Sequence, residues 1–495
     1  MRRHRHPTFR SSPRPRRQGA HATLTVAALV LTTLTTVPAT AAAPTAPTAP
    51  TAPGPHCARQ AHLRVPGAEH QRSACLDELT TAGTVASGHT DPADWAGLTP
   101  KDLAVPSGVP GVQIDGYFPD TSATNTNHGR QHDAQFVIRL PDRWNGGLVV
   151  AGTPGNREQY ANDRAIADWV LARGYAYAAT DKGNTGLAFH RDGKAPGDAI
   201  AEWNDRVTQL TRAARAVVAQ RYHRPPARTL ATGMSNGGYL VRWQLENHPE
   251  LYDGGVDWEG TLWRSDGPNL LDFLPKAMRA YPVYAAGGAG AEEARRELHA
   301  AGFPAGSEFL WPYHHKVYWD LTQRIYREEL DPGFDGPTEA GTPYCLPGTP
   351  ACDADYDYAA RPAEVRQAVR KIALTGRIGK PLITLHGTLD ALLPIGRDSD
   401  VYARMVREAG RGSLHRYYRI EGGTHTDSLV DAFPDGGLRP LTPCHRTAFT
   451  ALEGWLATGH RPPASRTVAR PVGQDPVTLA NACPLDTPKA TGAPS

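Results

Sequence analysis

A serine flanked by glycines is the first feature of this chain that suggests chemistry. Residues 233–237 read Gly-Met-Ser-Asn-Gly, a G-x-S-x-G pattern centred on Ser235, between an apolar run at 229–232 and a helix-like run at 239–247. This pattern is typical of a tight turn between a strand and a helix, which projects the serine hydroxyl above a sheet. The start of the helix then points at the hydroxyl and favours negative charge there, so we predict that Ser235 is a nucleophile.

Two further residues supply what such a nucleophile requires. A serine hydroxyl needs a histidine to take its proton and a carboxylate to orient that histidine. Asp390 follows a predicted strand at 381–386, and His425 lies in a glycine-rich loop after a predicted strand at 414–420. Reacting groups in parallel sheets gather at the carboxyl ends of strands, and the order Ser, Asp, His is that of α/β-hydrolases. We therefore predict a catalytic triad of these three residues.

Each of these assignments has a structural alternative. The serine would also fit as a cap of its own helix, and Asp390 as the cap of a turn. Asp257 and Glu259 are rival acids, because they lie on either side of the last residue of a predicted strand at 254–258. Most of the 20 histidines are expected at the surface, and the pair at 314–315 is expected to face solvent.

An acyl-transfer site also needs N–H donors for the oxyanion. The backbone N–H of Asn236, directly after the serine, is the first predicted donor. The second should come from the loop after a predicted strand at 147–152, which reads Thr153-Pro154-Gly155. Because proline has no backbone N–H, Thr153 or Gly155 is the expected donor.

Alternating strands and helices must position these residues. Strands are predicted at 134–140, 147–152, 175–180, 254–258, 381–386 and 414–420, and helices at 162–173, 201–220, 362–375, 398–409 and 445–457. Such alternation indicates a mostly parallel sheet covered by helices on both faces. A segment rich in Gly, Pro and aromatic residues interrupts it at 259–360, and a segment of that length is more plausible as a lid than as a loop. We predict an α/β-hydrolase fold with an inserted lid domain.

The beginning of the chain has the pattern of an export signal. An arginine-rich start precedes an apolar stretch at 22–37 and an Ala-Thr-Ala sequence at 39–41. We therefore expect a secreted, extracellular protein, and the apolar stretch is too short for a membrane span. The predicted segments are a signal peptide at 1–41, a Pro/Thr/Ala linker at 42–55, the first part of the hydrolase core at 56–258, the lid at 259–360, the second part of the core at 361–470 and a C-terminal tail at 471–495.

Charge argues against nucleic acid or an anionic membrane as a partner. The first 41 residues hold seven arginines and no acidic residue, so the +3 formal charge of the whole chain becomes about −4 without them. Six cysteines in an exported chain favour disulfides over a metal site. Their clustering suggests the pairs Cys57–Cys75, Cys345–Cys352 and Cys444–Cys483, although other pairings remain open.

With these residues placed, the chain resembles the tannase and feruloyl-esterase branch of the α/β-hydrolases, and within it the 3-hydroxybutyrate oligomer hydrolases. The matching stretches are 177–183, 234–238, 379–394 and the Pro-Pro pair at 462–463. The resemblance implies hydrolysis of carboxylic esters with no required cofactor. Fungal tannases carry a bridged cysteine pair where this chain has Met234 and Thr424.

The lid of that family often holds calcium between aspartate carboxylates, which makes two features of this lid relevant. Asp353, Asp355 and Asp357 form a D-x-D-x-D run whose hard oxygens would suit a structural calcium ion. Aromatic side chains also concentrate here, and most are expected to form a small lid core while some line a pocket. They are Trp258, Trp263, Phe309, Trp311, Tyr313, Tyr318, Trp319 and Tyr326.

Three functions are compatible with these features. The first is a secreted serine esterase that acts on hydroxyalkanoate oligomers or polyester fragments, or alternatively on aromatic-acid esters as tannases and feruloyl esterases do. The second is a secreted serine aminopeptidase, because the same triad order serves either chemistry. The third is a binding protein on a hydrolase scaffold, which requires that the triad be inactive. The expected partner is therefore a small or oligomeric ester, with no nucleic acid and no membrane.

Overall fold

A single sheet organises the part of the chain that the computed structural model describes, residues 63–119, 134–191, 193–334 and 353–486. Its ten strands lie in the order β1-β2-β3-β5-β4-β6-β7-β8-β9-β10. Pairing is antiparallel from β1 to β5 and parallel from β5 to β10. The strands are β1 (His70–Leu76), β2 (Gly111–Phe118), β3 (Ala134–Pro141), β4 (Gly147–Gly152), β5 (Ala176–Thr180), β6 (Arg228–Met234), β7 (Gly254–Trp258), β8 (Leu382–Gly387), β9 (His415–Ile420) and β10 (Arg466–Val468).

Helices cover both faces of this sheet. Successive residues of a strand point to opposite sides, and because the central strands are apolar on both sides, both must be buried. On β4, Leu148 and Val150 join one buried cluster and Val149 joins another. The first cluster includes apolar residues of α3, α4, α9 and α10, and the second those of α2 and α12. These helices are α2 (Asp168–Ala172), α3 (Asp198–Tyr222), α4 (Asn236–Asn247), α9 (Ala363–Lys371), α10 (Ser399–Glu408) and α12 (Thr442–Thr458). The predicted α/β-hydrolase class is confirmed.

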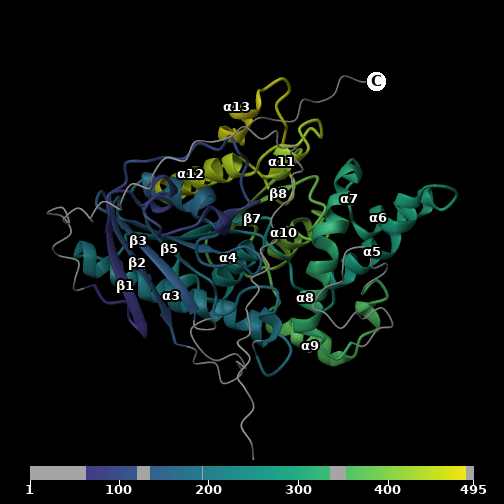
Figure 1. The fold of residues 1–495 in the computed structure, drawn as a ribbon, viewed down its shortest axis with the longest axis horizontal. Helices are drawn as coiled ribbons and strands as arrows, with labels where there is room; N and C mark the ends of the chain where they lie inside the picture. Colours follow the sequence, from purple (N-terminus) through teal and green to yellow (C-terminus); the bar gives the residue numbers. More distant parts are fainter. Residues whose placement is uncertain (1–62, 120–133, 192, 335–352, 487–495) are drawn as a thin grey trace, which may run out of the picture. The chain divides into compact units, whose positions relative to one another are not determined.

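The chain segment that connects β7 to β8, where a lid is predicted, is largely helical (Figure 1). They are α5 (Leu270–Ala286), α6 (Ala291–Ala301), α7 (Trp311–His314), a π-helical turn (His315–Trp319) and α8 (Asp320–Leu330). Trp263, Trp311 and Trp319 are fully buried here, as expected for aromatic residues of the lid that have a packing role. The same buried cluster continues into the sheet, so the lid helices pack on the hydrolase core rather than standing apart from it. The division of the chain into domains stays a prediction.

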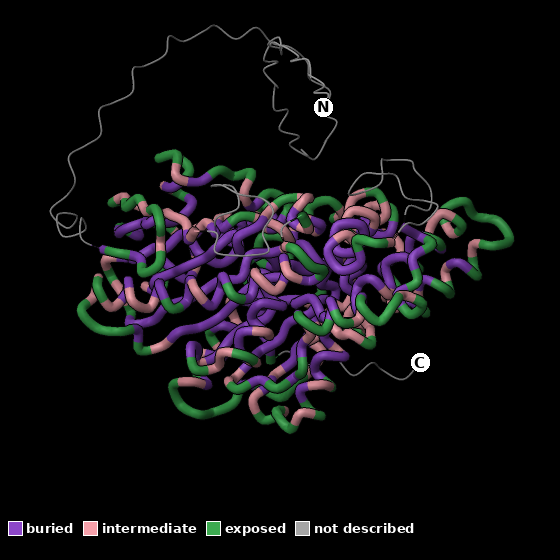
Figure 2. Tube along the Cα trace, turned by 90° about the horizontal axis from the view of Figure 1, so that it is seen from below, coloured by how far each residue is buried: buried purple, intermediate pink, exposed green. Residues whose placement is uncertain are grey.

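Some elements differ from those that the sequence predicts. The helix expected at 162–173 begins with a π-helical turn, Asp163–Ala167, before α2. Strands β1, β2 and β10 were not predicted, because β1 and β10 are edge strands with few buried residues and β2 contains glycines. Figure 2 shows that the buried segments of the chain lie in the interior and that exposed segments lie mostly at the periphery. The remaining α-helices of the described residues are short, α1 (Thr81–Thr84), α11 (Leu429–Ala432) and α13 (Pro476–Asn481), and short 3₁₀ turns occur in several of the connections.

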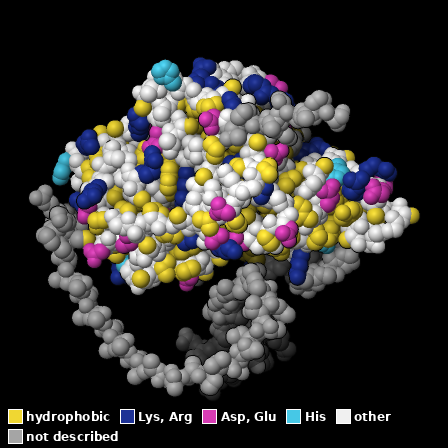
Figure 3. Space-filling model, turned by 90° about the horizontal axis from the view of Figure 1, so that it is seen from above, with side chains coloured by type: hydrophobic (Ala, Val, Ile, Leu, Met, Phe, Trp, Pro, Cys, Tyr) yellow, Lys and Arg dark blue, Asp and Glu magenta, His cyan; other side chains and the backbone are white. Residues whose placement is uncertain are grey.

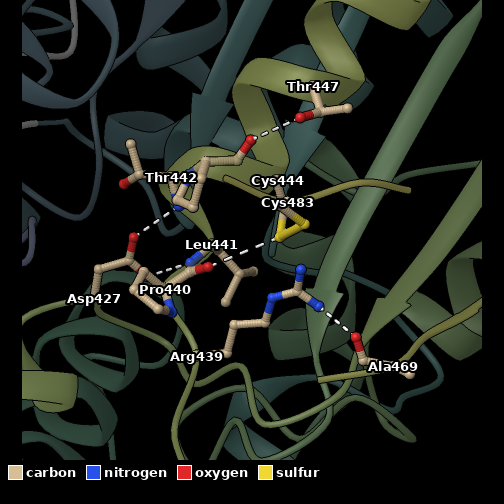
Figure 4. The surroundings of a disulfide bond; sticks show 10 residues. Asp427, Arg439, Pro440, Leu441, Thr442, Cys444, Thr447, Ala469 and Cys483 are labelled. Carbon is tan, nitrogen blue, oxygen red and sulfur yellow. Dashed lines mark hydrogen bonds between the residues drawn. A yellow bond between two sulfur atoms is a disulfide. The ribbon is translucent and has the colours of Figure 1, made fainter. Parts of the chain in front are cut away.

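A disulfide attaches the C-terminal segment to α12 (Figure 4). Cys444, in the first turns of α12, is bonded to Cys483, which follows α13, so this predicted pair is confirmed. Cys75 is also disulfide-bonded. Its expected partner, Cys57, and the expected pair Cys345–Cys352 lie outside the described residues, as do the predicted signal peptide and linker.

The surface of the described part carries mixed charge. On the face in Figure 3, basic and acidic side chains are interspersed among neutral ones. None of the described helices has both the length and the apolar character that crossing a membrane requires.

Candidate active site

Ser235 lies on a strained turn between β6 and α4. Its backbone has φ 55° and ψ −124°, a left-handed conformation that a non-glycine residue adopts only when its surroundings enforce it. The turn packs closely on β4, because a Cβ on Gly237 would lie 2.1 Å from the carbonyl oxygen of Gly152. Only glycine fits at position 237, and the glycines of the G-x-S-x-G pattern therefore permit the turn that presents the serine hydroxyl.

The structure brings Ser235, His425 and Asp390 together. Nε2 of His425 lies 3.0 Å from Oγ of Ser235, and Nδ1 of His425 lies 2.9 Å from Oδ2 of Asp390. The three residues follow the parallel strands β6, β8 and β9, and β7 lies between β6 and β8 in the sheet. The two loops that carry Asp390 and His425 are joined, because the N–H of Leu389 donates to the carbonyl of Gly423 at 2.8 Å. His425 is thereby held within hydrogen-bond distance of Ser235, which is 190 residues away in the sequence, and of Asp390, which is 35 residues away.

The Asp390 carboxylate is fixed in place and ionised. Its Oδ1 accepts the backbone N–H groups of Leu392 and Leu393, each at 2.8 Å. Its Oδ2 also lies 3.2 Å from Nε2 of His386. Burial alone would raise the pKa of Asp390, but the interactions with His425 and His386 outweigh it and hold the pKa well below its usual range. Such a carboxylate can orient His425 and stabilise its protonated form.

The two rival acids occupy different positions. Asp257 is engaged by Arg242, with 2.6 Å between Oδ2 and Nε, and accepts the N–H of Gly260 at 2.8 Å. Glu259 instead lies beside the triad, where its Oε2 is 3.9 Å from Nδ1 of His425. Asp390 therefore makes the hydrogen bond to His425, and Glu259 is a second carboxyl group at the same imidazole nitrogen.

The residues predicted to bind an oxyanion lie around the serine. Asn236 is the first residue of α4, and N–H groups in the first turn of a helix have no partner within the helix. Thr153 and Gly155 follow β4, the strand next to β6, and Gly155 has φ 50°. Both N–H groups therefore stay candidates for the second oxyanion donor.

Lys182 is a residue near the site that sequence reasoning did not single out. Its buried ammonium donates to the hydroxyl of Thr153 and, at 3.1 Å, to the carbonyl of Arg157, so it holds both ends of the loop that contains Gly155. Burial lowers the pKa of Lys182 to about 7, although the neighbouring Asp181 favours the charged form. The signal was present in the matching stretch at 177–183, which places a lysine two residues after a predicted strand end at 180.

The lid contacts the nucleophile turn through Asn236. The Asn236 side-chain amide donates to the hydroxyl of Tyr326 in α8, and its carbonyl accepts from Thr261 at 2.9 Å. Tyr326 is buried against Trp263, with 5.5 Å between ring centroids. The aromatic residues of the lid thus include one that hydrogen-bonds next to Ser235.

The expectation that the histidine pair at 314–315 faces solvent is wrong for His314. Its side chain is fully buried in the lid, and neither ring nitrogen has a hydrogen-bond partner among the described residues. Its ring stacks on Trp319 at 6.2 Å between centroids. Burial lowers the pKa of His314 to about 3, so the ring is neutral near pH 7. Nothing in the sequence around the two consecutive histidines indicates that His314 is buried.

The carboxylates predicted to bind calcium do not form a ligand set. Asp353 is buried against two guanidinium groups, 3.1 Å from Arg327 and 3.5 Å from Arg324. Asp357 caps a short helical turn by accepting the N–H of Ala359, and Asp355 is exposed. Because arginines neutralise Asp353, this run does not fit a calcium ion, and we derive no chemistry from one. Among the described residues, Glu259, His386 and Asp390 form the only group of three acidic, histidine or cysteine side chains whose ligand atoms lie close enough to share a metal ion.

Two family models match this chain over the parts that carry the site. Residues 120–257 match the model described as "Tannase and feruloyl esterase", and residues 344–493 match the model described as "3HB-oligomer hydrolase (3HBOH)". The first range contains Ser235, and the second contains Asp390 and His425. The resemblance expected from the motifs at 234–238 and 379–394 is confirmed.

Known proteins similar to this chain include several ester hydrolases. The D-(-)-3-hydroxybutyrate oligomer hydrolase of Polaromonas sp. is 33% identical over 135 residues, which cover 25% of this chain and 19% of that protein. The mono(2-hydroxyethyl) terephthalate hydrolase of Piscinibacter sakaiensis is 30% identical over 144 residues, or 26% of this chain and 23% of that protein. The chain therefore matches about a fifth of the length of these relatives. The crystal structure of feruloyl esterase B from Aspergillus oryzae aligns with a TM-score of 0.46 at 13% identity, over 82% of this chain and 91% of that one.

Proposed function

We propose that this protein hydrolyses carboxylic esters through an acyl-enzyme intermediate on Ser235. One observation carries the proposal, the continuous chain of contacts from Oγ of Ser235 to His425 at 3.0 Å and from His425 to Asp390 at 2.9 Å. A nucleophile, a base and an orienting carboxylate at these distances are what acyl transfer requires.

The reaction would proceed in two halves. Ser235 attacks the ester carbonyl while Nε2 of His425 takes the hydroxyl proton, and the carboxylate of Asp390 stabilises the resulting imidazolium. The oxyanion is stabilised by the N–H of Asn236 and a second N–H from Thr153 or Gly155. His425 then gives its proton to the departing alcohol, and a water molecule activated by the same histidine releases the acid.

The first substrate class we propose is hydroxyalkanoate oligomers or polyester fragments. The match of residues 344–493 to the 3HB-oligomer hydrolase model and the Polaromonas relative support the oligomers, and the Piscinibacter relative supports polyester fragments. Esters of aromatic acids are the second class, supported by the tannase and feruloyl esterase match at 120–257. A serine aminopeptidase remains the alternative from a different class, since the same three residues serve amide hydrolysis.

A substrate panel on the purified protein tests this proposal. We expect hydrolysis of p-nitrophenyl butyrate that Ser235→Ala abolishes and that Ser428→Ala, which removes a hydroxyl bonded to Gly97 rather than to the triad, leaves in place. Retained hydrolysis in Ser235→Ala would refute the proposed nucleophile. The 3-hydroxybutyrate trimer, methyl ferulate and an aminoacyl p-nitroanilide then distinguish the three classes. The same panel with a calcium chelator tests the calcium prediction.

We also propose that the protein is exported. The arginine-rich start and the apolar stretch at 22–37 support a cleaved signal, and the Cys444–Cys483 disulfide is compatible with an oxidising compartment. Sequencing the N-terminus of protein recovered from culture medium tests this, with cleavage expected near residue 41. Recovery of the full chain from the cytosol would contradict it.

A further inference from the structure

Two carboxyl groups from different strands flank one nitrogen of His425. Asp390 follows β8 and lies 2.9 Å from Nδ1, and Glu259 follows β7 and lies 3.9 Å from the same atom. A Ser-His-Asp arrangement needs only one carboxylate at this position. The second is therefore unexplained by the mechanism above.

Glu259 is held firmly beside the imidazole. Its side chain is fully buried, and its Oε1 accepts the N–H of Gly387 at 2.9 Å. Its backbone N–H donates to the carbonyl of Leu385 at 2.8 Å, and its φ of 51° lies in the left-handed region. A non-glycine residue adopts this conformation only where its surroundings enforce it, and such strain concentrates at functional sites.

The other oxygen of Glu259 has no assigned role. Among the described residues, Oε2 has no hydrogen bond of ordinary geometry, although it is buried and is the oxygen nearest to His425. Burial and repulsion from Asp390 raise the pKa of Glu259 well above its ordinary value. The side chain of Trp258 lies close enough to the carboxyl group to oppose the rise in its pKa. The titratable groups around it are Asp390 and His386 on one side and His425 and Asp427 on the other. With Asp390 ionised, the protonated form of Glu259 is favoured, and Asp390 makes the hydrogen bond that orients the histidine.

We infer that Glu259 is a second positioning residue for His425, able to accept the Nδ1–H when Asp390 cannot. The inference rests on the proposed esterase function. It requires a movement of about 1 Å, since a hydrogen bond to a charged acceptor is about 2.8 Å long. It also requires that Glu259 lose its proton to solvent, which removal of the Asp390 charge favours. The Nδ1–H then stays on His425 and is shared with Glu259, while Nε2 accepts the serine proton as before.

A double-mutant cycle tests this coupling. Asp390→Ala empties the space beside Nδ1, and Glu259→Gln is made in both the parent and the Asp390→Ala protein. We expect Asp390→Ala to lower kcat/KM for p-nitrophenyl butyrate by about 10²-fold, less than the roughly 10⁴-fold that losing the orienting carboxylate costs elsewhere. Glu259→Gln should then cost about tenfold more in the Asp390→Ala protein than in the parent. Equal effects in the two proteins would overturn the inference.

A second comparison leaves Glu259 unchanged, so it does not depend on the double variant being folded. Asp390→Asn keeps an amide beside Nδ1 that blocks the approach of Glu259, whereas Asp390→Ala does not. We expect Asp390→Ala to be about tenfold more active than Asp390→Asn, and its kcat/KM to rise with pH as Glu259 ionises. Equal activities and unchanged pH profiles in the two variants would refute the role of Glu259.

Failure of this inference is distinct from failure of the proposed function. If Ser235→Ala abolishes hydrolysis while the Asp390 variants show no coupling to Glu259, the esterase proposal stands and the second positioning residue does not exist. If Ser235→Ala retains hydrolysis, both fail.

Discussion

The indole N–H of Trp319 donates to the backbone carbonyl of Ala391 at 2.7 Å. Trp319 ends the π-helical turn of the lid, and Ala391 directly follows Asp390 in the loop after β8. Both side chains are fully buried, so the hydrogen bond is shielded from water. The position of the lid is therefore linked to the loop that orients the catalytic histidine of the proposed mechanism.

We predict that Trp319→Phe impairs catalysis. The phenyl ring keeps most of the packing but removes the N–H, which leaves the Ala391 carbonyl buried without this partner at a cost of about 1–3 kcal/mol. Because the loss falls on the Asp390 loop, kcat for p-nitrophenyl butyrate should fall several-fold along with the free energy of unfolding. Steady-state kinetics and urea denaturation of the same preparation measure both effects.

Trp311→Phe is the matched control for this prediction. Trp311 is equally buried in the lid, but its indole N–H donates to the hydroxyl of Ser307 at 2.9 Å, within the lid itself. The free energy of unfolding of Trp311→Phe should fall by a similar amount to that of Trp319→Phe, while its kcat should stay unchanged. If the two variants have the same kcat, the Trp319–Ala391 hydrogen bond does not act on the site.

Lys182→Met should lower kcat with little change in KM. The ammonium holds Thr153 and the Arg157 carbonyl, and without it the loop proposed to bear an oxyanion donor loses its support. Removing an oxyanion donor costs about 10²–10³-fold in kcat, so loosening one should cost about tenfold or more. Lys371→Met is the control, because that lysine forms an exposed ion pair with Asp198 at 2.7 Å. An unchanged kcat in Lys182→Met would show that the loop needs no such support.

That Ser235, His425 and Asp390 lie together could be predicted from the sequence because each of them has a local signal. Ser235 lies in a five-residue pattern, and Asp390 and His425 each follow a strand whose apolar run is easy to recognise. Because the strands are parallel, their carboxyl ends lie at the same edge of the sheet, and the three residues are expected to meet there. The central strands were predictable for the same reason, since residues buried on both faces form continuous apolar runs.

What the sequence could not predict depends on contacts between distant segments. The Glu259 carboxyl is a neighbour of His425 only because β7 and β9 flank β8, and spacing along the chain does not give its distance. His314 is a polar residue that the packing of α7 buries, against its usual preference. Asp353 resembled a calcium ligand in a D-x-D-x-D run, but Arg324 and Arg327 come to it from α8. Tertiary contacts decided each of these cases.

Buried histidines should make the fold less stable in acid. Burial lowers the pKa of His314, His415 and His445 to about 3 in each case. Between pH 6.5 and 3 the unfolded chain binds protons that the folded protein does not, so the free energy of unfolding falls as the pH falls through this range. At pH 5, each histidine should have lost about 2 kcal/mol of stability relative to pH 7.

Denaturant unfolding of His445→Gln at pH 7 and pH 5 checks this prediction. The difference in unfolding free energy between the two pH values should be about 2 kcal/mol smaller than in the parent, whatever the variant's stability at pH 7. His460→Gln, which alters an exposed histidine, should keep the parent difference. An unchanged difference in His445→Gln would mean that the buried ring does not resist protonation.

Removal of the Cys444–Cys483 disulfide should reduce stability without reducing turnover. The bond closes a separation of 39 residues, for which loop-closure entropy predicts a loss of about 4 kcal/mol on its removal. His425 is held independently of the bond, because Asp427 accepts the N–H groups of Leu441 and Thr442 at 2.6 and 2.7 Å and so attaches the histidine loop to the start of α12 (Figure 4).

The double variant Cys444→Ala with Cys483→Ala tests this separation of stability from activity. Its denaturation midpoint should fall, while kcat for p-nitrophenyl butyrate at a temperature where it is folded should match that of the parent. A reducing agent should also lower the denaturation midpoint of the parent. The reduced parent and the untreated variant need not have the same midpoint, because the reductant also breaks the disulfide of Cys75, which the variant keeps. A fall in kcat with the fold intact would show that α12 positions His425 only when the C-terminal segment is covalently attached to it.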